Sequence, residues 1–152
     1  MPLADATELT AWTRRIFIAA GVPPEVAHRV AESLVESNLV GHDSHGVIRV
    51  PQYLEMLGDG RINPRAEPRV VRETDSVAVI DGGWQFGQIC ARYAMEVALA
   101  KAARGGLAVV ELHESGHIGR LGEYAAQALV LDRKSTRLNS SHIQKSRMPS
   151  SA

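Results

Sequence analysis

The sequence has few of the features that would place it in a specialised class of protein. It contains one cysteine, Cys90, which excludes a disulfide framework and gives no support for a thiolate metal site. Lys and Arg together number 17, as do Asp and Glu, so the formal net charge is zero, whereas nucleic-acid-binding proteins usually carry a basic excess. With 45% hydrophobic and 22% charged residues, the composition is typical of a soluble globular protein.

Long apolar runs are also lacking. No segment approaches the roughly 18 apolar residues that a membrane-spanning helix needs. The first 15 residues do not combine a basic region with an apolar stretch, so they do not resemble a signal peptide. We therefore expect a cytoplasmic protein whose partners are neither membranes nor nucleic acids.

The last 21 residues, 132–152, differ in composition from the rest of the chain. Six are Ser, five are Lys or Arg, and the apolar residues follow no period, which predicts a disordered tail. Residues 132–142 and 146–152 also match the translation of a common short-read sequencing adapter, with residues 143–145 at its variable index. We therefore expect natural sequence only in residues 1–131, which carry 12 basic and 16 acidic residues, a net charge of −4.

Hydrophobic periodicity predicts three helices at the N-terminus. The first spans residues 5–20, with Asp5 at its capping position. The second runs from Pro24, a residue suited to the first turn of a helix, to Gly41. A short third helix is expected over roughly residues 51–57. These helices predict a helical layer in the first part of the chain.

Strands and helices are then expected to alternate. Residues 69–73 and 77–81 are predicted to be short strands, and residues 107–112 a buried strand because they are apolar apart from one glutamate. Helices are expected over residues 87–104 and 121–131. The inward face of the longer one is expected to carry Ile89, Tyr93, Val97 and Ala100.

The expected order of elements gives the fold class and the domains. We predict an α/β fold with an N-terminal helical segment over residues 1–60 and the start of an α/β domain over residues 61–131. Because the natural sequence ends on a helix that should lead into another strand, its β-sheet is expected to be incomplete. Residues 132–152 are assigned to the adapter-derived tail.

Polar groups concentrate in two glycine-bearing loops. The second loop follows a predicted strand at its carboxyl end, where open α/β sheets usually build sites. The first loop holds His42, Asp43, Ser44 and His45, with Arg49 just beyond. The second holds His113, Glu114, Ser115 and His117, with Arg120 beside it.

His45 and Arg49 suggest a chemistry for the first loop. An imidazole titrates near neutral pH and can exchange a proton with a carbonyl or alcohol. The planar guanidinium of an arginine suits a carboxylate. A proton donor beside a carboxylate-binding group is what a 2-oxo or 2-hydroxy acid requires.

The second loop permits other interpretations. Residues His113 to His117 fit H-E-x-x-H, the zinc-protease motif, but that motif requires a helix, and this segment directly follows a predicted strand. A metal site built from four histidines, His42 and His45 with His113 and His117, is a related alternative. The glycine-rich turn over residues 116–122 could instead present backbone N–H groups to a phosphate.

Two segments around these loops resemble one family. DSHGVIRVPQYLEML (43–57) and ESGHIGRLGEYA (114–125) resemble the malate/L-lactate dehydrogenase family of NAD(P)-dependent oxidoreductases, and the resemblance extends over residues 5–131. It implies a nicotinamide-binding fold that is not a Rossmann domain, in agreement with the absence of G-x-G-x-x-G. It also implies a homodimer acting on a small 2-hydroxy or 2-oxo acid such as malate or lactate, with NAD or NADP as cofactor.

The resemblance implies a role for four residues. The catalytic histidine of the family corresponds to His45, and a second histidine with an acid–base or substrate-polarising role corresponds to His117. The arginine that holds the substrate carboxylate corresponds to Arg49, and Ser44 lies where the family's loop approaches the substrate. No such role falls to His28, which we expect on a helix surface. No metal site is implied, and most cofactor contacts are expected beyond residue 131.

Members of this family are more than twice as long as this chain, so we expect the chain to be a fragment that is inactive alone. Steady NADH-dependent reduction of pyruvate or oxaloacetate by it would contradict this expectation. Two alternatives to an oxidoreductase stay open at this stage. One is a non-catalytic helical–α/β binding module, and the other is a zinc metalloprotein that uses His113, Glu114 and His117.

Overall fold

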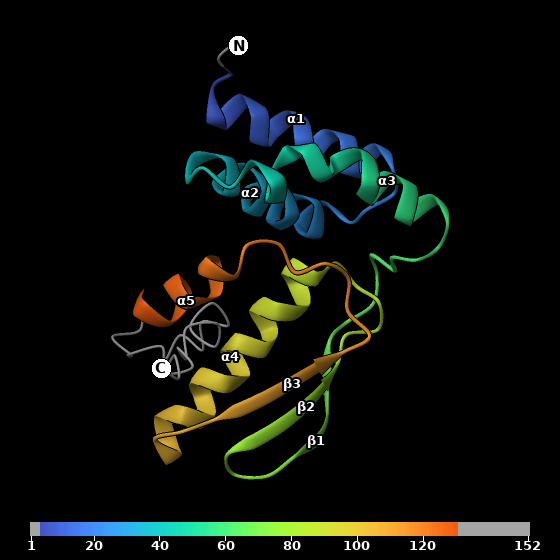
Figure 1. Ribbon diagram of the computed structural model, residues 1–152. Helices are drawn as coiled ribbons and strands as arrows, with labels where there is room; N and C mark the ends of the chain where they lie inside the picture. The colour runs from blue at the N-terminus through green and yellow to red at the C-terminus, as the bar shows by residue number, and fades with distance from the viewer. Residues whose placement is uncertain (1–3, 131–152) are drawn as a thin grey trace, which may run out of the picture.

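The computed structural model describes residues 4–130 of the chain, arranged as a helical layer above a sheet with two helices (Figure 1). The order of helices and strands is the one the sequence predicts, with two short 3-10 turns added in the first polar loop. Residue 131 and the tail predicted over 132–152 lie outside the described residues. Within residues 4–130, no helix is both long and apolar enough to cross a membrane.

The helical layer consists of α1 (Ala6–Ala19), α2 (Pro24–Leu39) and α3 (Val50–Gly58). The carboxylate of Asp5 accepts hydrogen bonds from the backbone N–H groups of Thr7 and Glu8, which satisfies two donors that the helix itself leaves unpaired. These contacts explain why α1 begins where the sequence predicts.

Large side chains from all three helices meet in one core. Phe17 of α1 and Tyr53 of α3 are almost completely buried, and Phe86, which precedes α4, contacts both. The Phe86 ring centroid is 5.7 Å from those of Phe17 and Tyr53, in edge-to-face arrangements that suit aromatic rings. The core residues of this cluster are Phe17, Val22, Ala27, Val30, Leu34, Tyr53, Ile62 and Phe86.

The sheet has three strands in the order β1 (Arg69–Glu73), β2 (Val77–Asp81) and β3 (Val109–His113). β1 and β2 are antiparallel, whereas β2 and β3 are parallel and are connected by the crossover helix α4 (Gly87–Gly105). The last helix, α5 (Leu121–Val130), lies beside α4 on the same side of the sheet (Figure 1).

The prediction that residues 107–112 form a buried strand is wrong. Leu107 is 68% exposed and Val109 is 58% exposed. β3 is an edge strand of the described sheet, and α4 covers only the face that carries Ala78 and Ile80. An apolar run indicates a buried strand only when both faces of the sheet are covered.

The inward face predicted for α4 is right for Ile89, which packs against the core, and wrong for Ala100. Ala100 is exposed, and Ile89, Tyr93 and Val97 are only half-buried. Fully buried positions include the polar Gln88 and Lys101. The buried ammonium of Lys101 donates to the carbonyl of Thr74 at 2.6 Å and pairs with Glu73 at 2.8 Å. These contacts compensate for the burial of a charged side chain on the inner face of α4. Hydrophobic periodicity does not anticipate a buried charge that is paired in this way.

Candidate functional site

The two polar loops come together between the helical layer and the sheet. The rings of His45 and His117 stack with their centroids 5.5 Å apart and an interplanar angle of 26°. His45 ends a 3-10 turn over Asp43–His45, and His117 lies in the loop between β3 and α5. Figure 1 shows this second loop running from the sheet up to the helical layer. Residues 72 positions apart in the sequence therefore share one site.

Asn38, near the end of α2, shapes the first loop. Its side-chain oxygen accepts from the backbone N–H of Val47 at 2.9 Å, and its amide donates to the Asp43 carboxylate at 2.6 Å. A Cβ atom on Gly46 would clash with the Asn38 side chain, so only glycine permits this approach. These contacts fix the segment that presents Ser44 and His45.

Within the described residues, Arg49 donates two side-chain hydrogen bonds, which leaves other N–H groups of its guanidinium free. Its Nε donates to the Ser44 carbonyl at 2.6 Å, and one terminal nitrogen donates to the Gln52 side chain at 2.8 Å. Among residues 4–130, it forms no ion pair with a carboxylate. A guanidinium with donors to spare and no counter-ion is suited to an anionic ligand.

The second loop rests on the turn that precedes α4. The N–H of Gly116 donates to the Gln85 carbonyl at 3.0 Å, and Gln85 is itself fixed by its amide, which donates to the carbonyls of Pro64 and Ala66. A Cβ on Gly87 would meet the carbonyl oxygens of Gly116 and His117, so glycine is required there for the close contact. The backbone position of His117 is thus set by packing against the start of α4.

Tyr53 and Gln88 lie beneath His117 and were missed in the sequence analysis. The Tyr53 hydroxyl is 3.0 Å from His117 Nδ1, and Gln88 Nε2 donates to that hydroxyl at 2.9 Å. Tyr53 is 1% exposed and Gln88 is 1% exposed. Tyr53 lies within the segment that carries the family resemblance, but nothing local in the sequence indicates that it reaches His117.

The surroundings favour a neutral imidazole at His117. Partial desolvation lowers the pKa of His117 below its ordinary value, and the nearby Arg49 and His45 lower it further. Burial raises the pKa of Tyr53, so its hydroxyl stays protonated. His45 has a different partner, because its Nδ1 lies 3.0 Å from the Ser44 hydroxyl.

Other predicted site residues lie elsewhere. The His42 ring is 6.4 Å from that of His45, in an edge-to-face arrangement. His113 is the last residue of β3 and faces Asp81, so the four histidines do not form one ligand cluster. The H-E-x-x-H motif does not lie on a helix, which excludes the zinc-protease geometry. His28 lies on the surface of α2, where it pairs with Glu32 at 3.2 Å, as expected.

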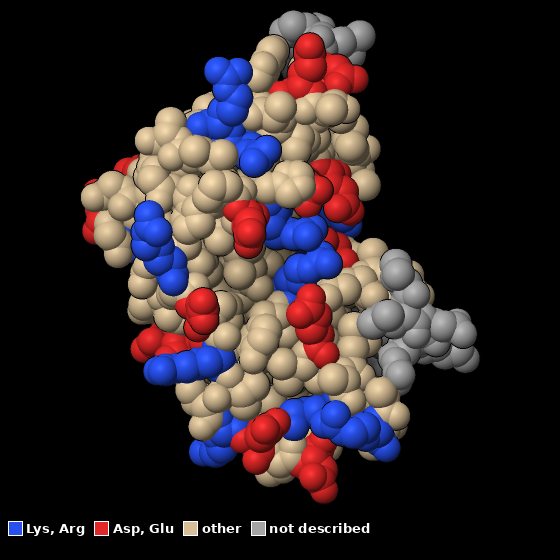
Figure 2. Space-filling model, turned by 180° about the vertical axis from the view of Figure 1, so that it is seen from behind, with Lys and Arg blue, Asp and Glu red and all other residues tan. Residues whose placement is uncertain are grey.

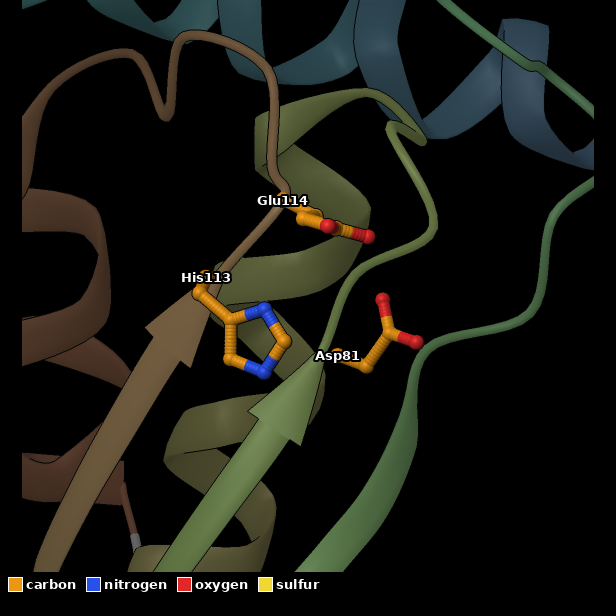
Figure 3. A group of neighbouring side chains, drawn as sticks. All are labelled: Asp81, His113 and Glu114. Atoms are coloured by element: carbon orange, nitrogen blue, oxygen red, sulfur yellow. The ribbon is translucent and has the colours of Figure 1, made fainter.

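Asp81, His113 and Glu114 form a second polar cluster, at the carboxyl ends of β2 and β3 (Figure 3). Each offers one ligand atom, and these atoms lie within 4.8 Å of one another, so the three residues could hold a metal ion. Asp81 is already engaged, because it accepts from the N–H of Gly83 at 2.8 Å and pairs with Arg69 at 3.3 Å. The Asp81 carboxylate is therefore partly committed to contacts within the chain.

The glycine-rich turn over residues 116–122 does not form a phosphate cradle. The Cβ position of Gly122 is occupied by the Arg120 guanidinium, which also pairs with Glu36 at 2.7 Å. Glu123 places a carboxylate in the first turn of α5, where a phosphate would need the N–H groups. Basic and acidic side chains are interspersed over the face shown in Figure 2. The described residues therefore fit a small carboxylate at Arg49 better than a dinucleotide phosphate.

Comparison with known proteins gives a consistent result. The chain is 37% identical over 123 residues to hydroxycarboxylate dehydrogenase B of Escherichia coli (strain K12), an alignment that covers 81% of this chain and 34% of that protein. The structure superposes on sulfolactate dehydrogenase from Methanocaldococcus jannaschii with a TM-score of 0.81 and 35% identity, over 84% of this chain and 37% of that one. For malate dehydrogenase from Pyrococcus horikoshii OT3, the TM-score is 0.78 at 36% identity, over 82% and 36% of the two chains.

The chain thus spans about a third of the length of the curated relatives it matches. The family model described as malate/L-lactate dehydrogenase matches residues 4–133, which include both polar loops and all the described helices and strands. The chain belongs to the malate/L-lactate dehydrogenase family.

Proposed function

We propose that the residues around His45 and His117 form the acid–base and carboxylate-binding part of an NAD(P)-dependent dehydrogenase for small 2-hydroxy acids such as malate or lactate. The observation that carries this proposal is the arginine without a counter-ion beside two stacked imidazoles. Three relatives are named for malate, sulfolactate or lactate as substrate, and all three names denote 2-hydroxy acids.

The proposed roles follow from the contacts. Arg49 binds the substrate carboxylate and so fixes the position of C2. His45 and His117 provide the groups that exchange a proton with, or donate a hydrogen bond to, the substrate oxygen. The Ser44 hydroxyl engages His45 Nδ1, which leaves His45 Nε2 for the substrate.

A nicotinamide cofactor, NAD or NADP, would accept hydride from C2 of the hydroxy acid or return it to the oxo acid. We assign it no contact residue, because the described part of the chain offers no phosphate cradle. We therefore propose that the 152-residue chain alone does not catalyse the reaction and that the activity belongs to a protein of the relatives' length. A homodimeric assembly and a cytoplasmic location stay predictions.

Ligand binding by this chain tests the proposal without requiring turnover. Pyruvate titrated into the ¹⁵N-labelled chain is expected to shift the ring signals of His45 and His117. Replacing Arg49 by Ala should weaken this binding by about 10–100-fold, because a charge-assisted pair is lost.

Two controls separate this effect from nonspecific binding. Pyruvamide, which lacks the carboxylate, should bind weakly to the unaltered chain. Arg72→Ala removes an exposed arginine on β1 and should leave pyruvate binding unchanged. Equal binding of pyruvate by the Arg49→Ala variant and the unaltered chain would contradict the assignment.

A further inference from the structure

Gln88, in the first turn of α4, is a buried polar residue to which the sequence analysis assigned no role. Its side-chain nitrogen donates to the Tyr53 hydroxyl at 2.9 Å, whereas its side-chain oxygen finds no hydrogen-bond partner within the described part of the chain. A buried carbonyl without a partner is unfavourable, so a purely structural role would be better filled by an apolar residue. The single bond to Tyr53 is therefore the feature to explain.

The direction of this bond determines the rest of the chain of hydrogen bonds. An amide nitrogen can only donate, so the Tyr53 oxygen accepts from Gln88. The single hydroxyl hydrogen of Tyr53 is then free to donate to its other neighbour, His117 Nδ1, at 3.0 Å. A neutral imidazole carries one hydrogen, and if Nδ1 accepts, that hydrogen lies on Nε2.

We propose that Gln88 is a positioning residue: through Tyr53 it holds His117 as the neutral tautomer with its hydrogen on Nε2. The catalytic meaning of this tautomer rests on the proposed function. An N–H group at Nε2 donates a hydrogen bond to the substrate oxygen but cannot accept its proton. His117 then polarises the substrate, and proton exchange falls to His45, whose Nδ1 is engaged by Ser44.

The lower pKa of His117 agrees with this division of roles, since it favours the neutral imidazole that a tautomer requires. It does not by itself select the tautomer. With the Gln88 amide oriented the opposite way, its oxygen would accept from Tyr53, and His117 would donate from Nδ1. The two arrangements differ in which ring nitrogen carries the hydrogen.

Two-bond ¹H–¹⁵N correlation spectra of the ¹⁵N-labelled 152-residue chain at pH 7.5 measure that difference directly. The His117 signals are assigned by their loss in His117→Gln. The unaltered chain should show the pattern of a ring protonated on Nε2. A ring protonated on Nδ1, or an even mixture of the two tautomers, would overturn the proposal.

Substitutions test whether Gln88 is the cause. In Gln88→Glu an ionised carboxylate can only accept, so Tyr53 should donate to it and the His117 hydrogen should move toward Nδ1; the ¹³C shift of the introduced carboxyl carbon reports its ionisation. Gln127→Glu makes the same change in charge on α5 and should leave the tautomer as it is. Tyr53→Phe removes the bond to Nδ1 and should also relax the preference, which keeps the test open if Gln88→Glu does not fold.

An unchanged tautomer in Tyr53→Phe, or in a folded Gln88→Glu whose carboxyl is ionised, would overturn the proposal. The readout needs no substrate. If pyruvate fails to bind while the Nε2 tautomer and its response to substitution are observed, the proposed function fails and the hydrogen-bond assignment stands.

Discussion

The helical half of the molecule and its sheet half are packed differently. In the helical half, Phe17, Leu34 and Tyr53 are buried in one cluster with Phe86. The sheet half buries Ile80 of β2, Cys90 of α4 and Tyr124 of α5, but one face of its sheet is open in the described residues. The exposed apolar residues of the strands and of the approach to β3 are Val71, Val77, Leu107 and Val109.

The candidate site lies where the two halves meet and draws on buried residues of both. Tyr53 belongs to the aromatic core through its ring and to the site through its hydroxyl. The core residue Tyr53 therefore holds a polar group of the candidate site in a fixed position. The second polar cluster, Asp81 with His113 and Glu114, lies at the ends of β2 and β3, and Asp81 pairs with the exposed Arg69.

The sharpest test of this comparison is one substitution in each half. Phe17→Ala should lower the free energy of unfolding by about 3–5 kcal/mol, because it leaves a large cavity in the core. Val109→Ala on the open face should change it by about 0.5 kcal/mol or less. Urea unfolding followed by circular dichroism measures both. Similar losses for the two variants would show that the two halves do not differ as described.

Local signals in the sequence account for the part of the fold that was predicted. The start of α1 depends on Asp5, and that of α2 depends on Pro24, so periodicity and end signals suffice for both. The burial of β3 was mispredicted because it depends on which strands lie beside it and on which faces are covered. That information is not local.

The same distinction applies to the candidate site. Ser44, His45 and Arg49 lie within one short segment, and their chemistry could be inferred from residue type, spacing and the family resemblance. Tyr53 and Gln88 could not be found in this way, because the bond from Tyr53 to His117 joins residues 64 positions apart and the one from Gln88 to Tyr53 spans 35. Their role depends on tertiary packing.

A second, smaller effect is expected within the sheet half, where two cations differ in burial. Lys101→Met should cost about 1–3 kcal/mol, because the buried ammonium donates to the Thr74 carbonyl and pairs with Glu73. Arg69→Met is the matched change at an exposed arginine that pairs with Asp81. It should change the free energy of unfolding by about 0.5 kcal/mol or less. The midpoints of urea unfolding measure both changes. If Arg69→Met lowers the free energy of unfolding as much as Lys101→Met does, burial of the cation does not determine its contribution to stability.

The smallest expected effect concerns the contact between the halves, where the Ser33 hydroxyl of α2 donates to Glu123 of α5 at 2.6 Å. Burial, the leading cause, raises the pKa of Glu123 above its unfolded value, so the stability this group contributes is complete below the unfolded pKa and falls as pH rises through the folded one.

Glu123→Gln keeps an acceptor for Ser33 without the charge. Thermal unfolding should therefore give equal midpoint temperatures for the two proteins at pH 3.5. At pH 7.5 the variant should have a slightly higher midpoint temperature, which corresponds to a free energy of unfolding larger by on the order of 0.5 kcal/mol. Exposed Glu67→Gln should leave both midpoints unchanged. A lower midpoint for Glu123→Gln at pH 7.5 would mean that the charge itself joins the two halves, through Arg120 or Arg92.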